Sequence, residues 1–326
     1  MVDPAGIAAF PGFSDLEVPS ALTFSEGKVR DVFYLDDEIV ISTSDRISAF
    51  DRILGVVPFK GEILNRLSVF WFEATEDIIQ NHLIATISPR AVLARSCHVV
   101  PVEVVVRGYL TGSAWRDYAA GRPVSGIELP AGMRENARFD QPLITPSTKE
   151  SDGLHDRPCS RDEILAADVV ERAVWEQIEE AAFALYRRGS DVAAERGLIL
   201  VDTKYEFGIA DGELYLIDEL HTPDSSRYWY ADTYQERFDA GSDQRKLDKE
   251  YLRKWLMERG WIGDGHPPLI PREVFDEVSR RYQTAFETIT GTEFRSQSAD
   301  IEAEKQKILL FIEERQDDDE EDDIEA

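Results

Sequence analysis

The spacing of apolar and polar residues predicts strands in the first third of the chain, with one helix among them. Residues 28–35 and 38–45 are rich in β-prone side chains, and the two Asp residues at 36–37 can form a hairpin turn between them. Residues 61–75 repeat apolar side chains at helical intervals. Residues 98–110 are Val-rich and almost continuously apolar, which is typical of a strand that is buried on both faces.

The rest of the chain predicts mainly helices, after one long irregular stretch. Residues 121–159 are rich in Gly, Pro, Ser and Asp, and long loops of this kind inside a compact protein are usually functional. A capping box at Ser160–Glu163 opens a helical segment, and a long amphipathic helix over 168–189 is expected to end at Gly189. Further helices are expected at about 243–259, 271–290 and 300–315.

This order of elements, strands first and helices last, is typical of an α+β protein with two lobes. We expect a β-rich N-terminal lobe at 1–110, an α/β C-terminal lobe at 111–315 and a disordered acidic tail at 316–326. The tail contains the run 317-DDDEEDDIE-325, whose eight acidic residues carry too much charge to pack against a core.

Composition and charge narrow the class of protein. A chain of 326 residues with 43% hydrophobic residues can bury a large core, which excludes global disorder. Its net charge of −28 argues against a nucleic-acid or anionic-membrane partner, because the long-range field of the protein repels polyanions. Two interpretations of this charge stay open: an ordinary acidic protein, and a protein adapted to high salt, where self-repulsion is screened.

Targeting and cysteine signals indicate a cytoplasmic protein. No apolar run approaches the roughly 20 residues that a membrane helix needs, and the first residues do not form a secretory signal. The two cysteines, Cys97 and Cys159, lie far apart without CxxC spacing, so neither a disulfide framework nor a zinc site is expected.

One predicted strand, 200-LVDTKYEFG-208, carries three charges at alternate positions. Successive side chains of a strand point to opposite faces, so Asp202, Lys204 and Glu206 would share one face. The apolar residues around them indicate a strand deep in the protein, where charges need partners. The other interpretation is an exposed strand on which Lys204 neutralises surface acids.

The register of the hairpin that follows decides which acid joins these charges. If Asp211-Gly212 is a two-residue turn, Lys204 faces Glu219, and Asp218 points to the opposite side. If residues 210–212 form a three-residue loop, Asp218 faces Lys204 instead.

In the second register, Asp202, Glu206 and Asp218 converge around one lysine. Carboxylates within a few ångströms of each other repel unless a cation joins them. Oxygen ligands without His or Cys suit Mg²⁺ or Mn²⁺, and Mg²⁺ usually accompanies a phosphate-bearing substrate.

Other stretches offer basic and hydroxyl side chains to an anion. Gly27-Lys28 at a strand entrance can hold phosphates, although it is no Walker A motif and a plain β-turn is the alternative. Arg107, followed by the hydroxyls of residues 111–113, makes a phosphate or carboxylate clamp, and an Arg that caps a sheet end is the alternative. The same chemistry recurs in Asp224, Ser225, Ser226 and Arg227 and in the loop 144–156 with Lys149. Together these stretches indicate ATP-dependent chemistry on an anionic small molecule.

Two stretches, 101-PVEVVVRGYLTGS-113 and 200-LVDTKYEFG-208, are similar to the signatures of one enzyme family. Through them the chain closely resembles the SAICAR synthase family of purine biosynthesis. The resemblance covers roughly residues 20–260, and the length suits the longer, yeast-like form. Further similar stretches are 27–33, 43–51, 60–72, 145–156, 218–229 and 248–256.

The resemblance implies a reaction and a fold. ATP phosphorylates the carboxylate of carboxyaminoimidazole ribonucleotide (CAIR), and the amine of L-aspartate attacks the acyl phosphate to give the succinocarboxamide ribonucleotide (SAICAR), ADP and phosphate. The implied architecture is two-lobed and similar to protein kinases. The partners implied are small molecules, and the protein would be a monomer or a small homo-oligomer.

The resemblance also implies roles for individual residues. Glu206 and Asp218 would hold Mg²⁺, which favours the three-residue loop, and Asp202 and Lys204 would be catalytic. Lys28 and Arg30 would lie over the phosphates of ATP, and the loop 145–156 would close over the site. The residues implied to bind the substrates are Arg107, Ser113, Lys149, Asp224, Ser226, Arg227 and Arg253.

Two other functions use the same features. A kinase-like phosphotransferase would stop at a phosphorylated product and would form ADP without aspartate. A nucleotide-sensing or cation-binding module would bind without turnover. Neither explains why anion clamps accompany the acidic hairpin.

Overall fold

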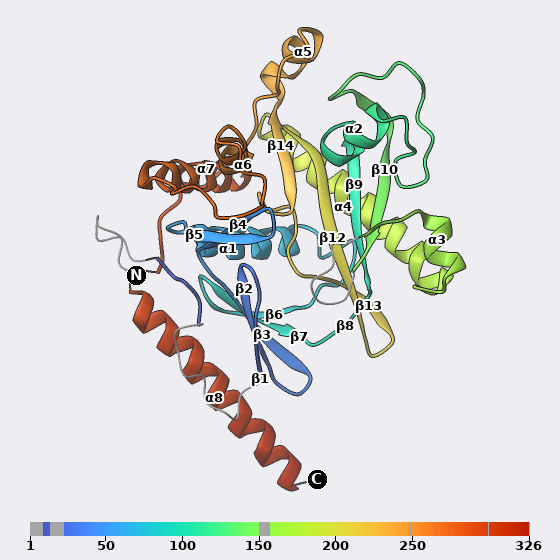
Figure 1. Cartoon of the computed structure of the whole chain (residues 1–326). Coiled ribbons are helices and arrows are strands. Elements are labelled where there is room, and N and C mark those ends of the chain that lie inside the picture. Colours follow the sequence, from blue (N-terminus) through green and yellow to red (C-terminus); the bar gives the residue numbers. More distant parts are fainter. Residues whose placement is uncertain (1–8, 14–22, 150–156, 248–249, 299, 326) are drawn as a thin grey trace. The chain divides into compact units, whose positions relative to one another are not determined.

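The computed structural model describes residues 9–13, 23–149, 157–247, 250–298 and 300–325 of the chain. The chain forms two compact units, and each is assembled from separate segments. The first unit comprises Met1–Phe70, His82–Ser96 and Asp248–Ala326, and the second comprises Trp71–Asn81 and Cys97–Leu247. These units therefore do not divide the chain at residue 110, where the sequence places the lobe boundary. Both units combine helices with antiparallel sheets, which confirms the α+β class (Figure 1).

The first unit contains a five-stranded antiparallel sheet in the order β1-β2-β3-β7-β6. The expected hairpin turn at 36–37 is confirmed, because Tyr34 pairs with Ile39 and Leu35 N donates to Glu38 O at 3.0 Å. The strands are β1 (Thr23–Glu26), β2 (Arg30–Tyr34), β3 (Glu38–Thr43), β6 (Leu83–Ser88) and β7 (Ala91–Arg95), and a separate pair is β4 (Arg46–Ala49) and β5 (Arg52–Val56). The helices are α6 (Glu250–Met257), α7 (Arg272–Thr290), α8 (Ile301–Glu325) and most of α1 (Lys60–Ala74), so the helices expected in these regions are found.

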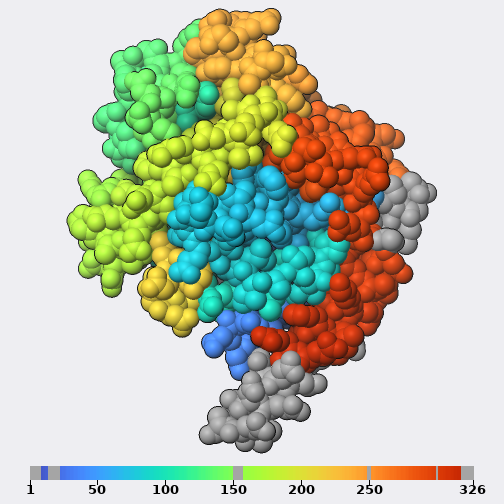
Figure 2. Space-filling view, turned by 180° about the vertical axis from the view of Figure 1, so that it is seen from behind, coloured from blue at the N-terminus to red at the C-terminus, as the bar shows by residue number. Residues whose placement is uncertain are grey.

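The core of this sheet is closed by the two ends of the chain. Phe13 packs edge-on against both Phe10 and Phe33, with ring centroids 5.6 and 5.1 Å apart. Ile308 and Ile312 of α8, one helical turn apart, are fully buried in the same cluster. Figure 2 shows α8, in red, against β6 of the same unit. Burial of each such side chain contributes roughly 1.5–3 kcal/mol, so both chain ends stabilise this sheet.

Helix α8 is longer than the sequence predicts. Its bounds, Ile301–Glu325, include most of the acidic run for which disorder is expected. Packing of the first turns nucleates the helix, and each further residue then adds one backbone hydrogen bond. Arg315 anchors it by an ion pair with Glu38 at 2.9 Å. The passive role of the tail stays a prediction.

The second unit is built on a seven-stranded sheet that centres on β12 (Leu198–Ala210). The path is β11-β10-β9-β12-β13, and β8 and β14 also pair with β12. Figure 1 shows α4 across one side of β9 and β12. The other strands are β8 (His98–Val99), β9 (Val102–Tyr109), β10 (Arg138–Thr148), β11 (Arg157–Pro158), β13 (Glu213–Ile217) and β14 (Ser226–Tyr230), and the helices are α2 (Gly112–Ala119), α3 (Arg161–Ala166), α4 (Arg172–Glu195) and α5 (Ala231–Asp239).

Three local predictions need correction. Residues 121–159 are not a continuous loop, because they contain the 11-residue strand β10; two prolines and many polar residues conceal its pattern. Helix α4 does not end at Gly189: a Cβ there would lie 2.3 Å from His221 Cε1, so this glycine permits close packing inside the helix. Strand β9 is fully buried on one face and half-buried on the other, which leaves the second face accessible. The capping box at Ser160–Glu163 is confirmed.

Candidate active site

The acidic hairpin adopts the two-residue register. Glu206 pairs with Ile217 and Ala210 pairs with Glu213, so Asp211-Gly212 forms the turn. Both turn residues have positive φ, 52° and 80°, as a type I′ turn requires and as Asp-Gly favours. The three-residue loop is therefore wrong, because the twist of a two-residue type I′ turn matches that of the strands it joins.

Asp218 nevertheless reaches Lys204. Strand β13 ends at Ile217, and Asp218 adopts a left-handed backbone with φ of 71°. This turn of the chain brings Asp218 Oδ2 to 3.6 Å from Lys204 Nζ. A left-handed non-glycine residue stores strain of roughly 1–3 kcal/mol, and such residues cluster at functional sites. Glu219, the partner of Lys204 by register alone, instead accepts a hydrogen bond from Thr222 Oγ1 at 2.6 Å.

Lys204 lies among three carboxylates. Its Nζ is 3.2 Å from Glu103 Oε1, forms an ion pair with Glu206, and contacts Asp218 as above. Lys149 also pairs with Glu206. Burial lowers the pKa of Lys204, but Glu206 and Glu103 outweigh it and raise that pKa above its ordinary value. Burial likewise raises the pKa of Glu206, yet Lys204 and Lys149 hold it at about 2. Both groups therefore stay charged across the neutral range.

A second cluster surrounds Asp202. Its Oδ2 accepts from Arg107 Nη1 at 3.0 Å and from Arg227 Nη1 at 2.7 Å. Arg107 also donates to Thr145 Oγ1 at 2.8 Å and to Ser113 Oγ at 3.1 Å. Burial lowers the pKa of Arg107, an effect that Asp202 opposes. Two guanidinium groups share one carboxylate, so the cluster keeps a net positive charge that suits an anion.

The backbone brings the second arginine close to helix α2. Gly112 has φ of 61°, and a Cβ at this position would lie 2.5 Å from Arg227 Nη1. Only glycine satisfies both constraints. The first turn of α2, with Ser113, therefore lies directly beside the two guanidinium groups.

Both clusters lie on one face of the sheet. Strand β12 pairs with β9 so that Asp202 lies opposite Arg107 and Lys204 lies opposite Val105. The Arg107 side chain contacts Asp202, and the Glu103 side chain contacts Lys204. Asp202 and Lys204 are two residues apart on β12, and two residues of a strand span about 7 Å. This is the half-buried face of β9, so a ligand can reach it. The expectation that Asp202, Lys204 and Glu206 share a side is confirmed.

Two predicted residues of the second unit lie outside these clusters. Ser226 Oγ donates to Thr203 Oγ1 at 2.8 Å, and Thr203 lies on the opposite face of β12 from Asp202. Asp224 lies in a tight turn, where its backbone N–H donates to Thr222 Oγ1 at 3.2 Å. Residues 150–156 of the expected closing loop lie outside the described residues.

The predicted residues of the first unit form a separate group. Lys28 lies in the turn between β1 and β2 and forms an ion pair with Asp51, with both side chains more than half exposed. Arg30 begins β2. The Arg253 guanidinium lies over the Phe50 ring, 4.8 Å from its centroid.

A sequence model of the SAICAR synthetase family matches residues 23–266 of the chain. The chain belongs to the SAICAR synthetase family. Among relatives, the phosphoribosylaminoimidazole-succinocarboxamide synthase of Bacteroides thetaiotaomicron is 47% identical over 298 residues, which cover 90% of this chain and 95% of that protein. The enzyme of the same name from Legionella pneumophila is 46% identical over 276 residues, 82% of this chain and 88% of that one.

Solved structures agree with this assignment. SAICAR synthase from Saccharomyces cerevisiae, complexed with SAICAR, has a TM-score of 0.76 at 33% identity and covers 87% of this chain and 100% of that one. A SAICAR synthetase in complex with ADP has a TM-score of 0.65 at 25% identity, with 84% and 100% coverage. This SAICAR synthetase is an ATP-dependent ligase of purine biosynthesis that joins CAIR and L-aspartate.

Two residues of these clusters are not among the site residues predicted from the sequence. Glu103 was missed although it lies four residues before Arg107 on one strand, and even spacing on a strand places both on one face. Thr145 was missed because β10 was taken for a loop.

The carboxylates fit a magnesium ion only in part. No group of three His, Cys, Asp or Glu residues that could hold a metal ion occurs in the described part of the chain. Glu206 and Asp218 both contact the Lys204 ammonium, so their oxygens converge on one point. Mg²⁺ commonly takes one or two protein carboxylates and completes its shell with phosphates and water. The pair fits that mode and not an all-protein cage.

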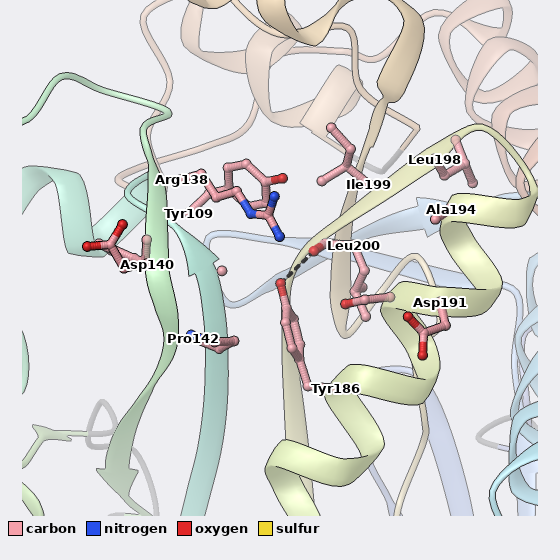
Figure 3. A pocket seen from close by; sticks show the side chains of 13 residues that line it. Tyr109, Arg138, Asp140, Pro142, Tyr186, Asp191, Ala194, Leu198, Ile199 and Leu200 are labelled. Carbon is pink, nitrogen blue, oxygen red and sulfur yellow. Dashed lines mark hydrogen bonds between the residues drawn. The ribbon is translucent and has the colours of Figure 1, made fainter.

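A cavity of about 310 Å³ in the second unit is not this site. It lies where α4 faces the sheet, and Tyr186 OH donates across it to Leu200 O at 2.7 Å (Figure 3). Tyr109, Arg138 and Asp191 also line it, and none of the residues predicted from the sequence does.

Proposed function

We propose that CAIR is phosphorylated and joined to L-aspartate on the sheet face that carries Arg107, Asp202 and Lys204. The observation that carries this proposal is the placement of a positive cluster and a carboxylate–lysine cluster on one accessible face, around Asp202 and Lys204, which are two residues, about 7 Å, apart along β12. A ribonucleotide with a phosphate at one end and a reacting carboxylate at the other presents matching charges.

The positive cluster binds the phosphate of the ribonucleotide. Arg107 and Arg227 each donate to Asp202 through Nη1, and a guanidinium, with five N–H groups in a planar fork, is suited to phosphate oxygens. Ser113 adds a hydroxyl beside them. Asp202, for which the sequence predicts a catalytic role, accepts from both guanidinium groups at one oxygen and so orients them.

The lysine–carboxylate cluster serves the phosphoryl transfer. Glu206 and Asp218 would hold Mg²⁺, which supplies neutralising charge between the ATP phosphates and the substrate carboxylate. Lys204 stays protonated because its carboxylate neighbours raise its pKa, so it stabilises negative charge and does not act as a base. Lys149, paired with Glu206, is placed to bind aspartate or phosphate.

The reaction then follows in two steps. The terminal phosphoryl group passes from ATP to a carboxylate oxygen of CAIR, and ADP leaves. The aspartate nitrogen attacks the acyl carbon, the bond from that carbon to the phosphorylated oxygen breaks, and the amine proton and phosphate depart. The remaining assignments to ATP or substrates are Lys28, Arg30, Asp224, Ser226 and Arg253. We further propose a cytoplasmic monomer or small homo-oligomer.

Release of ADP by the purified protein tests this assignment. With ATP, Mg²⁺ and CAIR, we expect sustained ADP release only when L-aspartate is added, together with SAICAR formation. Lys204→Met should lose both, because it removes the ammonium that Glu103, Glu206 and Asp218 share. Equal ADP release with and without aspartate would support the phosphotransferase, and nucleotide binding without release would support the binding module.

A further inference from the structure

The turn that contains Lys28 is held by one buried arginine, Arg46. Arg46 is 4% exposed and begins strand β4. Its Nη2 donates to Gly27 O at 3.0 Å and its Nε donates to Lys28 O at 3.3 Å. One rigid guanidinium therefore binds two consecutive carbonyl groups of the turn.

Arg46 is itself fixed by a fully buried carboxylate. Arg46 Nη2 lies 2.5 Å from Asp31 Oδ1, and Asp31 Oδ2 accepts from Phe13 N at 2.9 Å. Arg46 Nη1 also donates to Pro11 O at 2.8 Å. Breaking a buried ion pair from one side is strongly destabilising, so the fork has little freedom to move.

The chain passes over this pair at a glycine. A Cβ on Gly12 would lie 2.1 Å from Arg46 Nη1 and 2.3 Å from Asp31 Oδ2. Gly12 also has φ of 95°, which disfavours any other residue. The Arg46 guanidinium therefore connects residues 11–12 to the turn at residues 27–28.

The direction of the carbonyls fixes the direction of the amides. A trans peptide is planar, with C=O and N–H pointing to opposite sides. Because Gly27 O and Lys28 O point to Arg46, the N–H groups of Lys28 and Val29 point away from it. Neither N–H donates to a backbone acceptor within the described part of the chain. Two adjacent amides with one direction make a concave anion site.

The Lys28 side chain adds an exchangeable charge at the same turn. Its ion pair with Asp51 is exposed, and exposed pairs contribute at most about 1 kcal/mol. A phosphate can therefore replace Asp51 as the partner of Lys28 at little cost. Gly27 keeps the turn tight, since a Cβ there would lie 2.8 Å from Arg30 O.

We propose that Arg46 is a positioning residue for ATP: it fixes the turn so that the N–H groups of Lys28 and Val29 and the Lys28 ammonium face the phosphates together. This inference rests on the proposed role of Lys28 at ATP. Arg46 itself touches no substrate, because its donors are directed to Gly27, Lys28, Asp31 and Pro11.

The test compares Arg46→Lys with Arg90→Lys. Arg90 is a matched control, since it is 1% exposed and its guanidinium pairs with Asp45 and Glu304 of the same unit, not with the turn at 27–29. Lysine keeps the charge, but its three donors sit on one nitrogen and cannot reproduce the planar guanidinium, which reaches three carbonyl groups and both oxygens of Asp31. We expect Arg46→Lys to raise the KM for ATP about tenfold, the effect of 1.4 kcal/mol, with the KM for CAIR and aspartate unchanged. Arg90→Lys should leave the KM for ATP unaltered.

A measurement on the unaltered protein covers the case in which Arg46→Lys does not fold. Adding ADP should slow amide hydrogen exchange at residues 28–29, and unchanged exchange there would overturn the proposal. An equal rise in the KM for ATP in Arg46→Lys and Arg90→Lys would also overturn it. Lys28→Met distinguishes the proposed role of Lys28 at ATP from the positioning role of Arg46. If Lys28→Met leaves the KM for ATP unchanged, the proposed role of Lys28 is wrong. If Lys28→Met raises that KM while Arg46→Lys does not, only the positioning role fails.

Discussion

Asp218 lies 3.6 Å from Lys204 although the pairing of their strands directs the two side chains to opposite faces. The contact exists because Asp218 leaves the strand in a left-handed conformation. A residue that is strained into contact with a lysine that already pairs with a second carboxylate is more typical of a binding site than of a sheet edge.

Asp218→Asn should abolish synthesis and leave the fold intact. Asn has the volume of Asp and tolerates a left-handed backbone, but it is a poor ligand for Mg²⁺. We expect kcat/KM to fall at least about 100-fold, measured as aspartate-dependent ADP release. Asp211→Asn is the matched control, since Asp211 lies in the same hairpin and also has positive φ, 52°. Near-normal turnover in folded Asp218→Asn would falsify the metal assignment.

Arg227→Lys should weaken the binding of CAIR and not that of ATP. Lysine cannot bind Asp202 and a phosphate with a planar fork, so the KM for CAIR should rise roughly tenfold or more. Arg245→Lys provides the control, because Arg245 in the same unit lies over the Tyr230 ring at 3.8 Å, away from the cluster. A larger rise in the KM for ATP than in that for CAIR would contradict the assignment of the positive cluster.

Stability should fall as the pH drops below 6.5. His82 and His221 are fully buried, and burial lowers the pKa of each from 6.5 to about 3. Above pH 6.5 these rings are neutral in both the folded and the unfolded protein. Between pH 6.5 and about 3 the rings bind protons in the unfolded chain but stay neutral in the folded protein, so protonation favours unfolding. Two such groups reduce the free energy of unfolding by up to about 2.7 kcal/mol per pH unit. Urea unfolding at pH 7, 6 and 5 measures this slope.

The histidine assignment has its own check. His221 Nε2 and Tyr205 OH form a hydrogen bond of 2.7 Å. Replacing His221 by Gln keeps a polar group that can form this bond but cannot titrate. In His221→Gln the slope between pH 6.5 and 5 should therefore be about half as steep. An unchanged slope would show that this ring takes up its proton in both states.

Deleting residues 316–326 should leave turnover unchanged. Ile308, Ile312 and Arg315 contact the sheet from α8, and the deletion spares all three. Ile312→Ala is the contrasting change and should cost roughly 2–5 kcal/mol of stability by leaving a cavity. Both are measured by urea unfolding and ADP release. A large loss of activity on deletion would mean that the acidic run has a role in the reaction.

Salt should stabilise the protein. At a net charge of −28, self-repulsion opposes the compact state, and salt screens it over a Debye length that falls to about 3 Å at 1 M. The free energy of unfolding should rise between low and molar KCl. No gain over that range would remove the hypothesis of adaptation to high salt.

The parts of the fold that were predicted correctly depend on short stretches of chain. The turn at 36–37, helix α1 and the shared face of Asp202, Lys204 and Glu206 follow from local periodicity alone. The position of Asp218 does not, because it depends on a backbone angle that the preceding strand does not set.

The errors have a common physical origin in tertiary packing. Gly189 was read as the end of a helix, but it makes room for His221, a residue 32 positions later. Strand β10 forms because β9 offers it a hydrogen-bonding edge, although its own composition is that of a loop. Local propensity decides an element only where no distant partner overrides it.

The closure of the first sheet by both chain ends has a consequence for synthesis of the protein. Phe10 and Phe13 meet Ile308 and Ile312 in one core, so these two aromatic residues cannot complete their packing until residues about 300 positions later have been made. The second unit needs nothing beyond Leu247. On the ribosome, where domains generally fold as their segments emerge, the unit that begins the chain is therefore the one completed last.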